Sequence, residues 1–91
     1  MDFKTIDELK QRVKPALYSK LKEIHALGYK IVSTKDIWDY LVKYKWNNKK
    51  DIELNELVSD ILYENNYSIY SYVLEEIKKK KDSFDKETDV L

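Results

Sequence analysis

The sequence predicts an all-α protein: a compact bundle of about five helices whose second to fourth helices are compatible with a helix-turn-helix-like arrangement. A single glycine and a single proline among 91 residues leave few points at which a helix would break. Apolar residues recur at steps of three and four and do not alternate with polar ones. The length and the 43% of hydrophobic residues suit one core. We therefore expect one helical domain over residues 1–81 and a disordered acidic tail over 82–91.

The N-terminal half is predicted to form two helices around the proline. Apolar residues are spaced for a helix over about 5–13, and because proline cannot donate a backbone hydrogen bond, Pro15 should lie in the first turn of a second helix. Gly28 is expected to end that helix as a left-handed cap, followed by an extended connector. Ser33 or Thr34 is placed to cap the next helix.

The C-terminal half is predicted to contain three more helices. The segment 34–46 is apolar over more than one stripe, which is typical of a central helix. Apolar residues in 54–62 match the i, i+3, i+4, i+7, i+8 template. The segment 65–68 is expected to form a turn that also caps a last helix, which reaches about residue 81. The predicted core of the bundle is Trp38, Leu41, Leu57, Val58, Ile61, Leu62, Tyr70, Val73 and Leu74.

Catalytic and metal-binding chemistry is not predicted. The only histidine, His25, lies late in a helix, and without cysteine it cannot form a Cys/His dyad or a typical transition-metal site. One glycine cannot build a glycine-rich phosphate loop. Glu56 and Asp60 lie one turn apart on the expected solvent face, where nothing would raise their pKa for acid–base work. We therefore expect a protein without enzymatic activity and without a cofactor.

The residue usage also bears on where the protein acts. The absence of cysteine is typical of a reducing compartment. The first residues lack the apolar stretch of a secretory signal, and nowhere do about eighteen apolar residues run together. These observations predict a cytoplasmic protein with no membrane insertion.

Charge is segregated along the sequence although the net charge is zero. Residues 10–50 contain eleven lysines or arginines and three acids, a net charge of +8, whereas residues 51–77 contain seven acids and no base. The two segments can neutralise each other in the fold, or they can present separate charged surfaces.

The basic segment 10–50 suggests contact with RNA. Lysines neutralise phosphates, and the aromatic residues between them can stack on unpaired bases. A single arginine among many lysines favours contacts with little sequence preference. If the lysines converge on one patch, the RNA hypothesis gains weight; if carboxylates of 51–77 lie among them, it loses weight. The candidate nucleic-acid residues are Lys20, Lys22, Lys30, Lys43, Lys45, Lys49 and Lys50.

The alternative is a protein–protein interaction module. The helix over 54–62 presents an acidic face, and eight tyrosines in 91 residues are more than a small bundle is expected to bury. Exposed tyrosine is a favoured anchor at protein interfaces. The candidate partner-binding residues are Glu56, Asp60, Tyr67 and Tyr72.

Three stretches of the sequence are similar to a known family. The first is Leu17-x2-Lys20-Leu21-x-Glu23-x3-Leu27-Gly28-Tyr29, the second Thr34-x3-Trp38-x2-Leu41-x-Lys43-x-Lys45-Trp46, and the third Leu54-x2-Leu57-Val58-x-Asp60-Ile61-Leu62. Over about residues 8–77 the chain resembles the small ComN-like post-transcriptional regulators of Firmicutes.

The resemblance implies a cytoplasmic protein that regulates gene expression after transcription and is not an enzyme. In that family this regulation is connected with the message of a competence operon, so an mRNA is an expected partner. The resemblance also implies association with a coiled-coil protein that marks cell poles and division sites, and therefore a location there. The shared motifs are mostly structural, so the resemblance assigns no functional residue.

Overall fold

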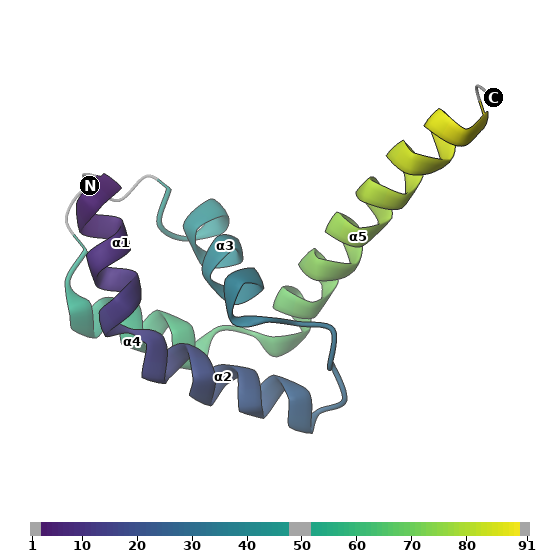
Figure 1. The fold of residues 1–91 in the computed structure, drawn as a ribbon. Coiled ribbons are helices and arrows are strands. Elements are labelled where there is room, and N and C mark those ends of the chain that lie inside the picture. The colour runs from purple at the N-terminus through teal and green to yellow at the C-terminus, as the bar shows by residue number, and fades with distance from the viewer. Residues whose placement is uncertain (1–2, 48–51, 90–91) are drawn as a thin grey trace.

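The computed structural model describes the backbone of residues 3–47 and 52–89 and the side chains of residues 8–47 and 52–81. These ranges form five α-helices and no strand: α1 (Phe3–Arg12), α2 (Lys14–Ala26), α3 (Thr34–Tyr44), α4 (Leu54–Tyr63) and α5 (Asn66–Asp89) (Figure 1). The predicted all-α fold of about five helices is confirmed. A helix-turn-helix-like arrangement of its second to fourth helices stays a prediction.

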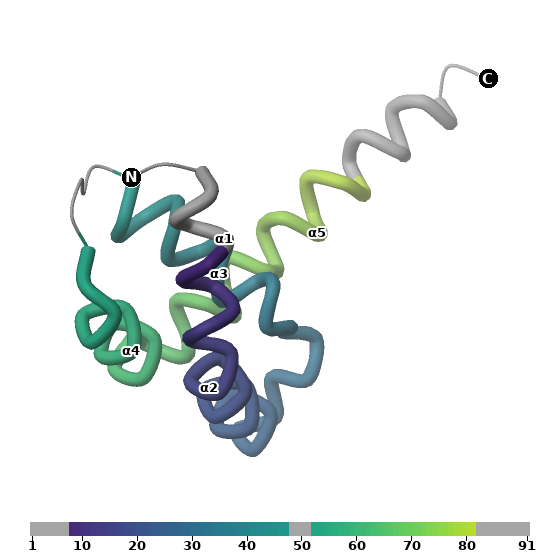
Figure 2. Tube along the Cα trace, turned by 60° about the vertical axis from the view of Figure 1, so that its left-hand side comes forward, coloured from purple at the N-terminus to yellow at the C-terminus, as the bar shows by residue number. Residues whose placement is uncertain are grey.

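Helix α2 holds the bundle together. It contacts α1, α3 and α4, while α3 also contacts α4 and α5. Figure 1 shows α2 and α4 running side by side, with α3 above them. Helix α5 begins against this body and then points away from it up to residue 81, as both Figure 1 and Figure 2 show. The first turns of α5 are therefore the part that packs, and the side chains of residues 77–81 are exposed.

The boundaries of α2 follow local sequence signals. Pro15 lies in the first turn, as predicted. The helix ends in a Schellman motif, in which the N–H of Gly28 donates to the carbonyl of His25 and the N–H of Tyr29 donates to the carbonyl of Ile24. Gly28 has a φ of 98°, a conformation that residues with a side chain rarely adopt. The left-handed cap predicted at Gly28 is confirmed.

Helix α3 begins with a capping box and ends two residues before the predicted residue 46. The Ser33 hydroxyl accepts a hydrogen bond from the N–H of Asp36, whose carboxylate accepts one from the N–H of Ser33. At the other end, the N–H of Trp46 donates to the carbonyl of Leu41 at 2.9 Å. Because this bond turns the chain back, the Trp46 ring lies edge-to-face with that of Trp38, 5.2 Å between centroids.

The core combines residues of α2 to α5 with residues between the helices. Its buried apolar members are Val13, Leu17, Ile24, Val32, Ile37, Trp38, Leu41, Trp46, Ile52, Leu57, Ile61, Ile69 and Val73. Two residues of the predicted core, Val58 and Tyr70, are partly buried against this set. The predicted burial of Trp38, Leu41, Leu57, Ile61 and Val73 is confirmed.

Two residues of the predicted core are exposed, so the prediction is wrong for them. Leu62 is 38% exposed because α4 buries a narrower stripe, along Leu57 and Ile61, than its apolar pattern suggests. Leu74 is 43% exposed although it directly follows the buried Val73, because successive residues of a helix point in different directions and Val73 takes the inner one. Apolar spacing identifies the inner face of a helix, but the neighbouring helices decide how wide that face is.

Helix α5 is capped and is longer than predicted. The Oδ1 atom of Asn65 accepts a hydrogen bond from the N–H of Ser68 at 2.9 Å, so the predicted cap within 65–68 is confirmed. The helical backbone extends past the boundary predicted near residue 81 to Asp89. A separate tail over 82–91 stays a prediction, since the side chains from residue 82 onward are not described. Within the described ranges, no helix combines the length and the apolar character needed to cross a lipid bilayer.

Candidate functional site

Lys20, one of the candidate nucleic-acid residues, is a buried structural residue. It is 3% exposed, and its Nζ donates to the carbonyl oxygens of Leu62 at 3.2 Å and Glu64 at 2.6 Å. It also lies 3.0 Å from the carboxylate of Glu23. Because its three hydrogen bonds are made inside the protein, Lys20 cannot reach a phosphate.

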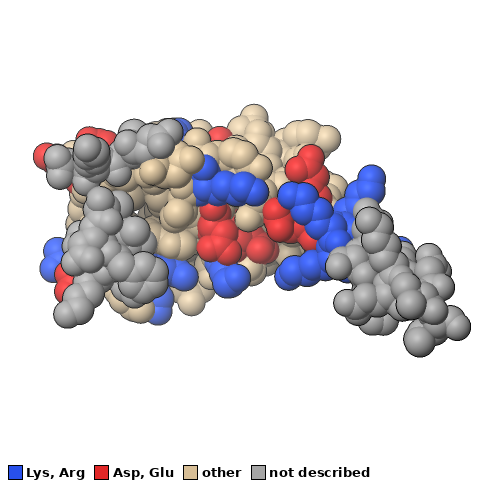
Figure 3. Space-filling model, turned by 90° about the horizontal axis from the view of Figure 1, so that it is seen from above, with Lys and Arg blue, Asp and Glu red and all other residues tan. Residues whose placement is uncertain are grey.

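Lys43 and Lys45 lie among carboxylates of the acidic segment. The Nζ of Lys45 is 3.4 Å from Oε2 of Glu64 and 3.8 Å from Oδ1 of Asp60. The Nζ of Lys43 is 4.0 Å from Oε1 of Glu76. Figure 3 shows the same mixture on one face, where acidic side chains occupy the middle and basic ones surround them. The lysines of 10–50 therefore do not form one uninterrupted basic patch on this face.

The remaining candidate lysines divide into two groups. Lys22 and Lys30 are exposed, as is Lys14 on the same helix as Lys22, and these three form no ion pair among the residues whose side chains are described. Lys49 and Lys50 lie outside the described residues. Free exposed lysines are thus found on and just after α2.

Asp60 was expected on the solvent face but lies partly buried against Trp46. Its side chain is 19% exposed, and its Oδ2 accepts a hydrogen bond from the indole Nε1 of Trp46 at 2.8 Å. Lys45 lies on the other carboxylate oxygen. The expectation is wrong because Trp46 turns back from the end of α3 onto α4, which the pattern of α4 alone does not reveal. Glu56 does lie on the exposed side of α4.

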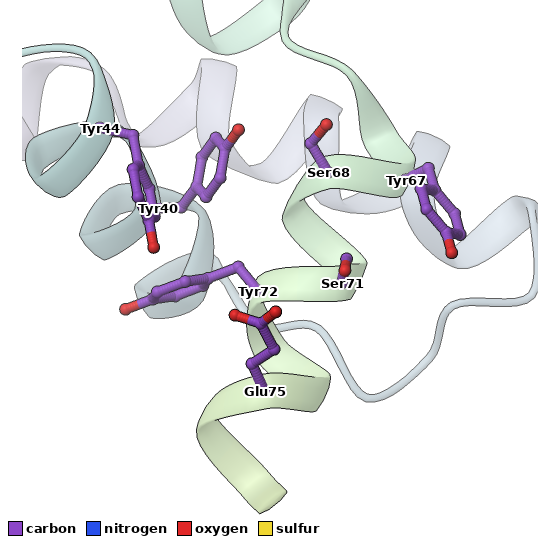
Figure 4. Close-up of a pocket in the computed structure, with 7 residues that line it drawn as sticks. All are labelled: Tyr40, Tyr44, Tyr67, Ser68, Ser71, Tyr72 and Glu75. Carbon is purple, nitrogen blue, oxygen red and sulfur yellow. The ribbon is translucent and has the colours of Figure 1, made fainter. Parts of the chain in front are cut away.

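The two candidate tyrosines, Tyr67 and Tyr72, line one groove between α3 and α5. The groove has a volume of about 320 Å³ and is lined by Tyr40, Tyr44, Tyr67, Ser68, Ser71, Tyr72 and Glu75 (Figure 4). We call it the tyrosine groove. Tyr67 is 65% exposed and Tyr44 56% exposed. Large aromatic surface is therefore open to a binding partner at this site.

Three of these tyrosines form a mutual aromatic cluster. The ring centroid of Tyr40 lies 5.1 Å from that of Tyr44 and 5.6 Å from that of Tyr72, and the last two are 5.9 Å apart. The Nζ of Lys43 lies 5.4 Å and 5.7 Å from the centroids of Tyr44 and Tyr72, within the range of a cation–π contact. These contacts hold the rings in place, so little side-chain entropy would be lost on binding.

Two hydroxyl groups of the cluster, those of Tyr40 and Tyr72, have a raised pKa. Burial raises the pKa of Tyr72 above its ordinary value, and the carboxylate of Glu76 raises it further. Burial also raises the pKa of Tyr40, with a smaller contribution from Glu64. A tyrosine hydroxyl is uncharged at neutral pH, and the raised pKa keeps these two uncharged to a higher pH, so both can donate or accept hydrogen bonds.

His25 lies at a shallow and separate site. Its Nε2 is 2.7 Å from the carbonyl oxygen of Val32, and it lines an open depression of about 430 Å³ with Tyr18, Ser19, Leu21 and Lys22. No acid belongs to this lining. Among the described residues, no three His, Asp or Glu side chains lie close enough to hold a metal ion.

Sequence reasoning found half of the tyrosine groove. It singled out Tyr67 and Tyr72, but it counted Tyr40 and Tyr44 only among the aromatic residues between the lysines of segment 10–50. The i, i+4 spacing of Tyr40 and Tyr44 is the available signal, since it places both rings on one side of α3. The meeting of α3 with α5 places the four rings along one groove.

Comparison with known proteins identifies the family to which the chain belongs. Residues 6–88 match the family model described as "Post-transcriptional regulator". A stretch of 56 residues is 46% identical to the "Post-transcriptional regulator ComN" of Bacillus subtilis (strain 168). That stretch covers 62% of this chain and 57% of ComN, so the chain spans little more than half of its relative. No solved structure matches the chain.

Proposed function

Because the chain belongs to the post-transcriptional regulator family, we propose that it regulates gene expression after transcription as a non-enzymatic adaptor, with the tyrosine groove as its partner-binding site. The resemblance noted from the sequence, over about residues 8–77, leads to the same family. In this proposal a partner protein binds in the groove, and that partner, rather than the chain itself, contacts the message.

The observation that carries the proposal is the gathering of four tyrosines in one groove. Tyr44 and Tyr67 present more than half of their surface, and the less exposed Tyr40 and Tyr72 pack against Tyr44. Tyrosines on a fixed scaffold are favoured interface anchors, because each combines a large apolar ring with a hydrogen-bonding hydroxyl. Glu75 at the edge of the groove disfavours a phosphate there and is compatible with a protein ligand.

A helix is the partner element that suits the groove. The groove lies between two helices, and a third helix can lie along such a furrow with its apolar residues between the tyrosine rings. A coiled-coil protein offers such a helix, which agrees with the partner expected from the family resemblance. If that partner marks cell poles or division sites, the regulator would be found there through this contact.

The test compares the wild-type chain with a Tyr44→Ala/Tyr67→Ala variant in pull-downs from a lysate treated with RNase. Tyr63→Ala serves as the matched control, because Tyr63 is 85% exposed but does not line the groove. We expect a coiled-coil protein to be retained by the wild type and by Tyr63→Ala and to be lost from the double variant. Equal retention by all three proteins would reject the groove as the binding site.

Direct RNA contact through α2 is a second candidate function. Lys14, Tyr18 and Lys22 are spaced i, i+4, i+8 and so lie along one side of α2, Tyr18 is 60% exposed, and the exposed Lys30 follows the helix. One lysine on each side of an exposed ring suits a single strand of RNA. The lysines would neutralise its phosphates, and a base would stack on the ring of Tyr18.

RNA binding is tested by its dependence on salt. Three lysines on single-stranded phosphates predict that log affinity falls with log salt with a slope of about −2. Replacing Lys14, Lys22 and Lys30 by Gln should remove most of that slope. The control is a variant with the same number of lysines replaced by Gln on α5 instead of α2, namely Lys78, Lys80 and Lys81. Binding that the α2 variant leaves unchanged would reject α2 as the RNA-binding face.

A further inference from the structure

A second exposed surface lies where the connector between α2 and α3 meets α5. Leu27 and Ile31, which flank the connector's turn, are 58% and 48% exposed, and Leu74 and Ile77 of α5 are 43% and 48% exposed. We call Leu74, Ile77 and the Tyr29–Tyr70 pair at the start of α5 the α5 ledge; Leu27 and Ile31 lie before and after Tyr29 on the connector. Large apolar side chains gathered on one surface mark an interaction site more often than single scattered ones do.

The α5 ledge is continuous because Tyr29 joins the connector to α5. The rings of Tyr29 and Tyr70 are stacked, with centroids 4.2 Å apart and planes at 15°. Figure 1 shows the connector passing the base of α5. Leu74 and Ile77 lie four and seven residues after Tyr70, so the three side chains follow one side of the helix out of the body.

The rim of the α5 ledge is basic. Lys78 and Lys81 are exposed and lie one turn beyond Leu74 and Ile77, and the exposed Lys30 lies next to Ile31. The two acids on this part of α5 lie elsewhere, because Glu75 lines the tyrosine groove and Glu76 pairs with Lys43 of α3. Helix α5 therefore has an acidic, aromatic side facing α3 and a basic, apolar side facing away from it.

This charge distribution selects the occupant. Two copies of the chain joined through the ledge would bring lysine rims against each other, which is unfavourable. A flat membrane surface suits the ledge poorly, because interfacial helices bury an apolar face many residues long. Between Tyr70 and residue 81, where the side chains of α5 are described, the exposed large apolar residues are Leu74 and Ile77. A helix with apolar residues on one side and carboxylates beside them is complementary to both parts: its apolar side fits the ledge, and its carboxylates fit the lysines of the rim.

We propose that the α5 ledge docks an acidic amphipathic helix of a partner protein. From Tyr70 to Lys81 the ledge extends for about 17 Å along α5, which is the length of about three helical turns. The apolar residues of the partner helix would pack on Leu74 and Ile77, while its carboxylates approach Lys78 and Lys81. The site adjoins the tyrosine groove, because the ring of Tyr67 lies 6.4 Å from that of Tyr70, but Leu74 and Ile77 do not line the groove. These two residues therefore give the adaptor a second partner surface.

The probe is a labelled synthetic peptide of about three heptads, with leucine at positions a and d and glutamate at the flanking positions. Its counterpart has lysine in place of every glutamate. Fluorescence anisotropy with the full chain should show binding of the glutamate peptide that weakens with added salt, and no binding of the lysine peptide. Equal binding of the two peptides would overturn the proposal, because charge would then not select the occupant.

Variants locate the binding. The double variant Leu74→Ser/Ile77→Ser should lower the affinity for the glutamate peptide by about tenfold or more, since a loss of about 1.4 kcal/mol of apolar burial corresponds to a factor of ten in affinity. Lys78→Gln/Lys81→Gln should weaken it several-fold, whereas Lys79→Gln, whose lysine pairs with Glu76, should not. Tyr44→Ala should also bind normally, which separates this site from the groove. Circular dichroism checks folding, and Ile77→Ser alone serves if the double variant unfolds.

The other occupants are tested in parallel. Phosphatidylglycerol vesicles that bind the chain in a manner abolished by Leu74→Ser/Ile77→Ser, with no peptide binding, would overturn the proposal in favour of a membrane surface. Self-association in sedimentation, lost in the same variant, would overturn it in favour of a second copy. A monomer that binds the glutamate peptide and ignores the vesicles supports the proposal.

Discussion

The ammonium nitrogen of Lys20 on α2 lies 2.6 Å from the main-chain carbonyl oxygen of Glu64, at the end of α4. It also binds the carbonyl oxygen of Leu62. The last carbonyls of a helix lack partners within the helix and form its negative end, so a buried cation there satisfies both hydrogen bonding and charge. A lysine that the sequence assigned to phosphate contact thus joins two helices.

Replacing Lys20 should destabilise the fold. Lys20→Met keeps the length of the side chain but leaves the carbonyls of Leu62 and Glu64 without their donor, so the free energy of unfolding should fall by about 2 to 3 kcal/mol. Urea denaturation measures it. Lys22→Met on the exposed side of α2 is the control and should change it by less than about 0.5 kcal/mol. Equal stability of both variants would contradict the structural role of Lys20.

The hydrogen bond between Trp46 and Asp60 should also contribute to stability. Trp46 is 4% exposed, so Asp60→Ala leaves its indole N–H without an acceptor and should lower the free energy of unfolding by about 2 to 3 kcal/mol. Asp60→Asn keeps an acceptor oxygen and should cost about 1 kcal/mol. Thermal unfolding distinguishes the series. If Asp60→Ala is no less stable than Asp60→Asn, the bond is not maintained in solution.

Leu57 and Leu62 lie in one apolar pattern but should respond differently to truncation. Leu57 is fully buried, so Leu57→Ala should cost about 2 to 5 kcal/mol through lost burial and a cavity. Leu62 is partly exposed, and Leu62→Ala should cost about 1 kcal/mol. Both values come from chemical denaturation of the two variants. Similar losses would show that α4 buries a wider face than described.

Acid should weaken the contact of α2 with the start of α5. A hydrogen bond from Asn66 and the ammonium group of Lys20 hold the pKa of Glu23 below its ordinary value of 4.5. A lowered pKa in the folded state means that the stabilisation is present above the unfolded value and is lost as pH falls below about 4.5. Denaturation midpoints of the wild type and Glu23→Gln should therefore converge as pH falls from about 7 to about 3.

The control for this dependence is Asn66→Ala. It removes the largest cause of the lowered pKa, so it should reduce the difference in acid sensitivity between the wild type and Glu23→Gln. A wild type whose midpoint responds to pH in the same way as that of Glu23→Gln would show that Glu23 titrates normally.

Helix boundaries could be predicted because their signals are local. Pro15 and Gly28 act through the backbone conformations they permit or forbid, and Ser33 with Asp36 caps α3 within one turn. The end of α3 could not be predicted, since the chain leaves the helix to bring Trp46 against Trp38 and Asp60, and Asp60 lies on another helix.

The candidate site was only partly predictable. Tyr67 and Tyr72 stood out because a small bundle cannot bury so many tyrosines, and the structure places both in the groove. Lysine charge was a poorer guide: Lys20 is buried, and Lys43 and Lys45 lie beside carboxylates. Composition records how many charges and rings a chain has, but their partners depend on which helices meet.

By itself, the sequence determined an all-helical chain, the positions at which most of its helices begin, and its kinship with post-transcriptional regulators. Those properties depend on backbone preferences and on spacing within a few turns. Only the tertiary structure decided that Tyr40 and Tyr44 meet Tyr72 and line one groove with Tyr67, because this groove joins residues of two helices separated by α4. Exposure, and hence availability to a partner, is a property of this packing.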